Sequence, residues 1–144
     1  MTKCAIKGAT ALLLAMLLAG PSYAANMAEI NTCYQRAGDD AEKLQLCLKQ
    51  ELDAVKAEYK DASERVTVVA KAWDKPNRNR TRWDKLMRAN QAFDSYVKRE
   101  CEFVRSTTKG NQTAERNSLL ACQINLYRMR TDLLENRYLS SGQK

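Results

Sequence analysis

Four cysteines of this chain fall into two pairs, and a glycine lies between the members of each pair. These are Cys33 and Cys47 around Gly38, and Cys101 and Cys122 around Gly110. Two residues 14 positions apart in one straight helix lie about 21 Å apart, well beyond the roughly 7 Å between Cα atoms that a disulfide tolerates. A chain reversal at each glycine brings the partners together. Of the three connectivities that four cysteines allow, the spacing therefore favours Cys33–Cys47 with Cys101–Cys122.

The segments between these turns have a helical apolar pattern. After Asp39, which can cap a helix with Glu42 three residues on, apolar residues recur every three or four positions until Pro76 ends the pattern. They are Leu44, Leu48, Leu52, Val55, Tyr59, Ala62, Val66, Val69 and Trp73. This spacing predicts one buried face on a helix roughly 50 Å long, which is long for so small a domain and indicates an elongated shape.

Two further helices and a short one complete the expected fold. Thr81 and Asp84 resemble a capping box at the start of the second helix, whose predicted buried stripe is Leu86, Asn90, Phe93, Val97, Cys101 and Val104. The third helix is expected to bury Leu119, Cys122, Leu126, Met129 and Leu133 and to end near Tyr138. A short helical piece spans about 27–36. The prediction is an all-α fold, a small elongated bundle of helical hairpins with two disulfides.

The first 24 residues are expected to be a cleaved signal peptide. Lys3 and Lys7 precede an apolar run over 11–19, and Ala24 ends a small-residue cleavage motif. We expect a helical domain over 25–139, a flexible tail over 140–144 and no transmembrane segment once the signal is removed. Cys4 would leave with the signal peptide, so four of the five cysteines remain. An even number of cysteines in a short exported chain is typical of an oxidising compartment, so we expect a periplasmic or secreted protein.

The sequence lacks histidine and the motifs that most often indicate catalysis. The chain contains no histidine, the commonest general base and metal ligand. No glycine-rich phosphate loop is present, and the cysteine spacing does not fit a zinc site. We therefore expect a protein that is not an enzyme and holds no metal or cofactor.

The net charge is concentrated in one connection between helices, which we call the basic connection (71–88). It holds seven cationic residues against two acidic ones, a net charge of +5, and the rest of the mature chain sums to zero. Arg78, Arg80 and Arg82 are its candidate anion-binding residues, for a lipid surface, a cell-wall polymer or an acidic partner. Export argues against nucleic acid. The simpler interpretation, which the sequence favours, is a solvated linker with Trp73 and Trp83 in the core.

The second and third helices carry motifs that resemble those of a known family. The segment from Asn90 to Cys101 reads N-Q-A-F-D-S-Y-V-K-R-E-C, and the segment from Cys122 reads C-Q-I-N-L-Y-R-M-R. They resemble the Q-x-x-W-x-x-Y-R-x-x-x-C and C-x-x-x-L-T-x-x-R motifs of the lysozyme inhibitor LprI-like family of exported bacterial proteins. Val55 to Tyr59 resembles its L-N-x-x-Y element. The matching positions are Tyr59, Asn90, Phe93, Tyr96, Leu126 and Arg130, with Asn, Phe and Val97 standing where the family has Gln, Trp and Arg.

The resemblance implies an all-helical, disulfide-pinned exported domain and, for some members, inhibition of lysozyme. Such a protein would occlude the enzyme's cleft without turnover, although a mature chain of net charge +5 gains no long-range attraction to a basic lysozyme. The alternative is a structural or adaptor protein of the envelope that binds an anionic surface or polymer through the basic connection. Phe93 and Tyr96 are expected in the core, and Arg130 is expected to pair with an acid on a neighbouring helix.

Overall fold

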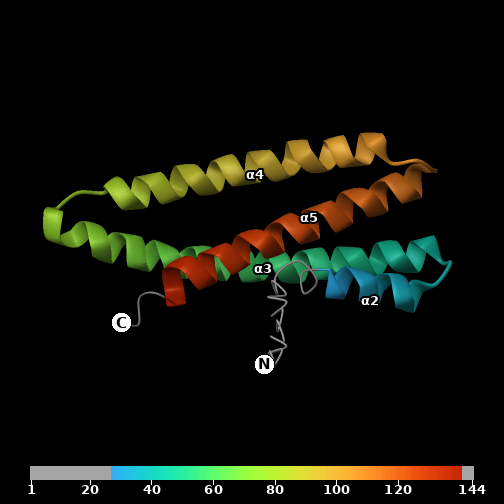
Figure 1. Ribbon diagram of the computed structural model, residues 1–144, viewed down its shortest axis with the longest axis horizontal. Coiled ribbons are helices and arrows are strands. Elements are labelled where there is room, and N and C mark those ends of the chain that lie inside the picture. The colour runs from blue at the N-terminus through green and yellow to red at the C-terminus, as the bar shows by residue number, and fades with distance from the viewer. Residues whose placement is uncertain (1–26, 141–144) are drawn as a thin grey trace, which may run out of the picture.

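The computed structural model describes residues 27–140, and their fold is all-α and elongated (Figure 1), as predicted. The helices are α2 (Ala28–Ala37), α3 (Ala41–Asp74), α4 (Thr81–Thr107) and α5 (Gln112–Leu134). A 3-10 turn, η1 (Lys75–Asn77), follows α3, and a single wide helical turn, η2 (Glu135–Leu139), follows α5. The expected signal peptide and the last four residues of the expected tail lie outside the described range.

The helices form two hairpins that share one end of the molecule. α3 is the long axis, α2 folds back along its first half, and α5 packs along α3 on one side and against α4 on the other. The α2–α3 and α4–α5 turns lie at the same end, and the α3–α4 connection lies at the opposite end (Figure 1). The basic connection is therefore at the tip of the molecule farthest from both glycine turns.

Both disulfides form the pairs that the cysteine spacing favours. Cys33 and Cys47 have Cα atoms 5.6 Å apart, and Cys101 and Cys122 have Cα atoms 5.5 Å apart. Gly38 between the first pair has a φ of +56°, which other residues adopt only with strain. Each disulfide fastens one hairpin near its turn and contributes about 3 kcal/mol on a loop-entropy estimate.

The core has two parts, stacked along α3. One lies near the disulfide end and joins α2, α3 and α5; its buried members are Ile30, Cys33, Leu44, Leu48, Leu52, Val55, Leu120 and Ile124. The other lies towards the basic connection; its buried members are Tyr59, Ala62, Val66 and Leu134, with Phe93 and Tyr127 packed on them. The predicted stripe of α3 is thus confirmed from Leu44 to Val66.

The last turns of α3 depart from the predicted stripe. Ala70 and Asp74 are buried there, whereas Val69 is half-buried and the side chain of Trp73 is 44% exposed. After Val66 the buried face advances by four residues at both steps, whereas the predicted stripe advances by three and then by four, so the buried face turns away from Trp73.

The predicted stripe of α5 is wrong. Leu120, Ile124 and Leu134 are the buried apolar residues, while Met129 and Leu133 are exposed. α5 lies between α3 and α4 and is therefore covered from two sides, so that most of its residues are partly buried. A sequence pattern that assumes one apolar face cannot predict which residues of such a helix are buried.

The predicted cap of α3 is off by one residue. The helix is capped by Asp40 and not by Asp39, since the Asp40 carboxylate accepts hydrogen bonds from the backbone N–H groups of Glu42 and Lys43 at 3.1 and 3.0 Å. The two acids are adjacent, and only the backbone conformation at the turn decides which of them faces the free N–H groups.

Candidate functional site

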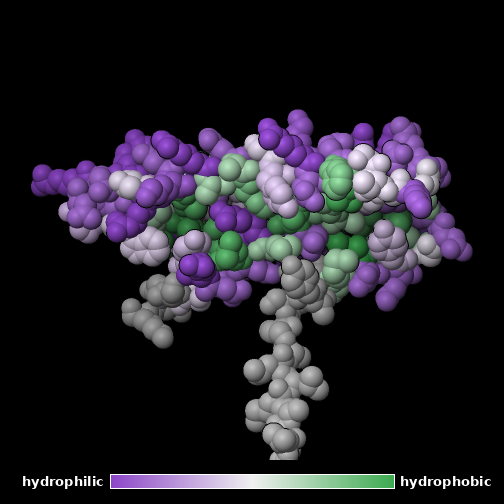
Figure 2. All heavy atoms as spheres, turned by 45° about the horizontal axis from the view of Figure 1, so that its top comes forward, coloured by the Kyte–Doolittle hydropathy of each residue, from purple (hydrophilic) through white to green (hydrophobic). Residues whose placement is uncertain are grey.

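The end of the molecule that carries the basic connection is strongly hydrophilic. Figure 2 shows polar residues covering this end, with apolar residues appearing between the helices further along. Arg78, Arg80 and Arg82 all lie here and are exposed, as the sequence analysis requires of an anion-binding loop. The structure therefore brings the three candidate residues together, but their side chains have different roles.

Asp74 joins the end of α3 to the start of α4. It is only 2% exposed, and its carboxylate accepts hydrogen bonds from the backbone N–H groups of Arg82 and Trp83, both at 3.0 Å. Burial raises the pKa of Asp74, but the hydrogen bonds from Trp83 and Arg82 and the charge of Arg82 outweigh it and hold the pKa below its ordinary value. The carboxylate therefore stays charged and caps α4, in place of the predicted Thr81 capping box.

Two of the three arginine side chains, those of Arg80 and Arg82, contact other residues of this end, and the third, that of Arg78, is available to a ligand. Arg82 donates to the carbonyl oxygen of Trp73 at 2.8 Å and lies 3.5 Å from the Asp74 carboxylate. Arg80 stacks on the ring of Trp83, 3.8 Å from its centre. Within residues 27–140 the side chain of Arg78 forms no ion pair, so it projects its full charge.

A groove opens beside the basic connection, between α3 and α4. It has a volume of about 350 Å³. Its lining residues are Val66, Ala70, Trp73, Arg82, Lys85, Leu86, Ala89, Arg130 and Tyr138. The exposed Trp73 forms part of its wall, and Trp83 is half-buried beneath Lys71 and Arg80. The expectation that both tryptophans lie in the core is therefore wrong, because the charged connection and the groove occupy the space where a core would be.

Three residues at or beside motif positions form an aromatic cluster. The ring centres of Tyr59, Phe93 and Tyr127 are 5.3 to 5.6 Å apart, and edge-on or tilted packing of this kind stabilises the core. Burial and the nearby charge of Asp94 raise the pKa of Tyr59 to about 12, so its hydroxyl is neutral in ordinary conditions. Leu126 is half-buried on α5.

Two other motif residues do not occupy the expected environment. Tyr96 is 50% exposed and lies outside the core, because it falls on the α4 face that no other helix covers. Arg130 donates to the side-chain oxygen of Asn90 at 3.3 Å, and Asn90 in turn donates to the Ser63 hydroxyl at 2.7 Å. Among the described residues, Arg130 forms no ion pair with an acid; the amide of Asn90 takes the place of the expected carboxylate.

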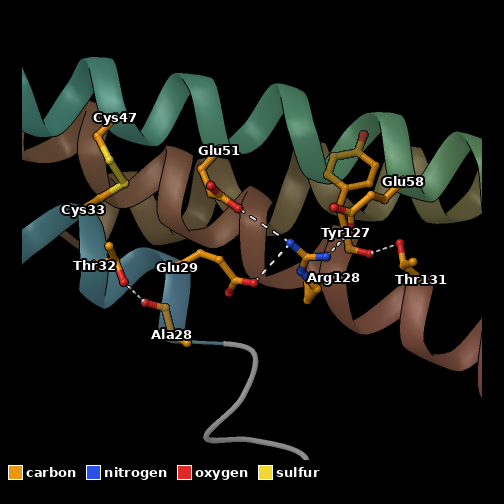
Figure 3. Close-up of polar contacts among 10 residues, drawn as sticks. All are labelled: Ala28, Glu29, Thr32, Cys33, Cys47, Glu51, Glu58, Tyr127, Arg128 and Thr131. Carbon is orange, nitrogen blue, oxygen red and sulfur yellow. Dashed lines mark hydrogen bonds and ion pairs between the residues drawn. A yellow bond between two sulfur atoms is a disulfide. The ribbon is translucent and has the colours of Figure 1, made fainter.

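The densest ionic contact of the fold is centred on Arg128, which the sequence analysis does not single out (Figure 3). The guanidinium of Arg128, on α5, pairs with Glu29 of α2 at 3.3 Å, with Glu51 of α3 at 3.6 Å and also with Glu58 of α3. Its side chain is 17% exposed. The seven-residue spacing of Glu51 and Glu58 on one helix face is the only signal in the sequence, and it does not identify the partner.

An acidic face extends from this contact along α3 and α5. Six carboxylates surround two guanidinium groups there, those of Arg128 and of Arg65, which lies 2.9 Å from Asp61. The carboxylates belong to Glu29, Glu51, Glu58, Asp61, Asp132 and Glu135. The net charge of this acidic face is therefore negative, in contrast to the basic connection.

Within the described part of the chain, no group of three or more His, Cys, Asp and Glu residues is placed to hold a metal ion. No helix of residues 27–140 has the length and apolar character that crossing a membrane requires. Comparisons with protein-family models, curated proteins and solved structures return no match for this chain.

Proposed function

We propose that this protein is an exported, non-catalytic binding protein that attaches to an anionic envelope surface or polymer through its basic connection. One observation carries the proposal. Of the two acids among the seven cations, Asp74 is buried as the cap of α4, so its charge is not presented to a partner. The other, Asp84, lies 3.8 Å from Arg80 in an exposed pair that contributes little.

The position of the basic connection supports this role. It lies at the tip of an elongated molecule, where a surface can approach without meeting the remaining helices (Figure 1). Exposed cations attract an anionic surface over about one Debye length, roughly 8 Å at physiological salt. The two disulfides are compatible with an oxidising compartment outside the cytoplasm.

Co-sedimentation with vesicles tests the proposal. The protein should bind vesicles that contain phosphatidylglycerol, should not bind vesicles of phosphatidylcholine alone, and should be released by added salt. The double variant Lys75→Gln, Arg78→Gln should bind much more weakly. Its matched control is Lys98→Gln, Arg99→Gln, which removes the same charge from exposed positions in the middle of α4.

Two results would overturn the proposal. One is equal weakening by the two double variants, because binding would then follow net charge and not the basic connection. The other is absence of binding both to anionic vesicles and to a soluble polyanion such as polyphosphate.

A second function, lysozyme inhibition, is favoured by the acidic face and by the family resemblance. Lysozymes of the animal type are basic, so the acidic face offers them the complementary charge that the net charge of the protein does not. Calorimetric titration with animal-type lysozyme should give saturable 1:1 binding, weakened by Asp61→Asn with Asp132→Asn and unchanged by the Lys75, Arg78 double variant. Absence of heat at both low and physiological salt would exclude this function.

A further inference from the structure

We propose that the groove between α3 and α4 binds a fatty-acid-type ligand, one acyl chain that ends in a carboxylate. The groove shares Trp73, Arg82, Lys85 and Leu86 with the basic connection, but Lys75 and Arg78 at the exposed tip do not line it. Binding in the groove does not require adhesion to a surface. Its volume of about 350 Å³ lies at the lower end of the range for small-molecule sites.

The groove has an apolar floor made by residues of α3 and α4. Val66 and Ala70, 2% and 3% exposed, form its base, and the side chains of Leu86 and Ala89 form the facing wall. The small side chains of Ala70 and Ala89 leave the space between the helices unfilled. Trp73 remains 44% exposed at the border of this floor, so that an acyl chain would remove its ring from water, which is favourable.

The charged residues of the groove are all cationic. Arg82, Lys85 and Arg130 line it, and no carboxylate does. Arg82 is already paired with Asp74, but within residues 27–140 neither Lys85 nor Arg130 forms an ion pair. These two side chains are therefore the ones whose charge a ligand can neutralise.

Arg130 is the residue that points most directly to an anion. Its Nε atom is buried and has no hydrogen-bond partner among the described residues. The guanidinium makes side-chain hydrogen bonds with Asn90 and with the Tyr59 hydroxyl, and both of these partners are uncharged. A guanidinium that is partly removed from water without a counter-charge is unfavourable. A carboxylate in the groove would supply both the acceptor and the charge.

The composition of the groove separates this ligand from other classes. A free phosphate would leave the apolar floor uncovered, and an uncharged lipid would leave Arg130 without a counter-charge. Apart from the three cationic side chains, the polar groups of the lining side chains are the Tyr138 hydroxyl and the Trp73 indole N–H. An extended peptide requires partners for its backbone groups, and the lining provides too few.

Fluorescence of Trp73 provides the readout for a direct test. In a Trp83→Phe background Trp73 is the sole tryptophan, since the chain has two. Dodecanoate below its micelle concentration should shift the emission to shorter wavelength with a saturable dependence on concentration. Butyrate, which lacks the chain, and dodecyl maltoside, which lacks the charge, should each bind at least about tenfold more weakly, or roughly 1.4 kcal/mol.

A variant that fills the groove distinguishes ligand binding in the groove from vesicle binding through the surface charge. Ala89→Phe adds a ring to an exposed position of the groove wall and changes no charge, so dodecanoate binding should be lost while binding to anionic vesicles persists. Ala92→Phe, one turn further along α4 and outside the groove, is the matched control and should bind dodecanoate normally. Arg130→Gln should weaken dodecanoate about tenfold, and Arg130→Lys should recover part of the loss.

Three outcomes would overturn the inference. The first is the absence of a saturable shift with dodecanoate. The second is equal affinity for dodecanoate and dodecyl maltoside, which would make the groove a general apolar surface. The third is unchanged binding in a folded Ala89→Phe variant, as judged by circular dichroism. None of these results bears on vesicle adhesion, so this inference and the proposed function can fail separately.

Discussion

The carboxylate of Asp74, at the end of α3, accepts a hydrogen bond from the backbone N–H of Trp83, in the first turn of α4, at 3.0 Å. The residue at the N-cap position of α4, Arg80, makes no such bond with its side chain. One helix therefore caps the next, and this contact fixes the angle at which the basic connection turns.

Replacing Asp74 by Asn should lower the melting temperature by several degrees. Asparagine keeps one acceptor oxygen but loses the charge that favours the N-terminus of α4 and pairs with Arg82. The control is Asp53→Asn, which removes the same charge from an exposed position of α3. Thermal unfolding by circular dichroism measures both variants, and equal melting temperatures would contradict the capping role.

The same residue predicts a pH dependence. The pKa of Asp74 is lower in the folded protein than in an unfolded chain, where it is about 3.9. Its contribution to stability is therefore complete above about pH 4 and is lost as the pH falls through the lowered folded value. Urea unfolding from about pH 6 to about pH 2 should show the wild type and Asp74→Asn converging at the acid end. A constant difference across this range would mean that the charge plays no part.

Replacing Arg128 by Met should destabilise the fold by about 2 kcal/mol, because three carboxylates would then face each other without a cation. This value is below the roughly 3–5 kcal/mol for breaking a fully buried pair, since Glu58 is half exposed and screened by water. Arg116→Met removes an exposed arginine of the same helix and should change the free energy of unfolding by less than about 0.5 kcal/mol. Urea unfolding measures both, and similar losses would show that the ion cluster is not stabilising.

Removal of each disulfide should raise hydrogen exchange in a different set of helices. Cys33→Ser with Cys47→Ser releases α2, which packs on α3 and reaches α5 through Glu29 and Ile30. Hydrogen exchange should then rise mainly in α2. Cys101→Ser with Cys122→Ser loosens the α4–α5 hairpin, and exchange should rise in both of these helices. Uniform loss of protection in the first double variant would show that α2 folds only together with the rest.

Arg78→Gly should raise the stability of the fold while it weakens vesicle binding. Arg78 has a φ of 50°, a conformation that glycine adopts without strain. The substitution should raise stability by roughly 0.5 kcal/mol, the relief of strain being partly offset by the greater freedom of glycine in the unfolded chain. Vesicle binding should fall at the same time, because one unpaired charge is lost. Chemical unfolding and co-sedimentation on the same samples test the pair of effects.

Local patterns predict part of this structure well. The buried face of α3 as far as Val66 and that of α4 follow from spacing along the chain, and the disulfides follow from cysteines placed around two turns. These features depend on residues close in sequence. The buried face of α5 does not, since it is set by two neighbouring helices at once.

The candidate site is predicted only in outline. The three arginines lie where the sequence places them, but the burial of Asp74 and the exposure of Trp73 depend on how the end of α3 meets the start of α4. Tyr96 is exposed because it lies outside the apolar stripe of α4. Arg128 contacts acids 70 and more residues away, so no local pattern could identify it. The groove likewise exists only between helices, and Ala89 has no distinguishing feature in the sequence.

Both covalent links lie at one end of the molecule, and neither disulfide joins α3 to α4. An apolar core lies towards each end of the molecule. Disulfides, which only a reductant can break, strengthen one end, whereas the Asp74 contacts, which respond to acid and salt, strengthen the other. A change in the surroundings would loosen the binding end first and leave the opposite end folded, so that recovery starts from an intact half.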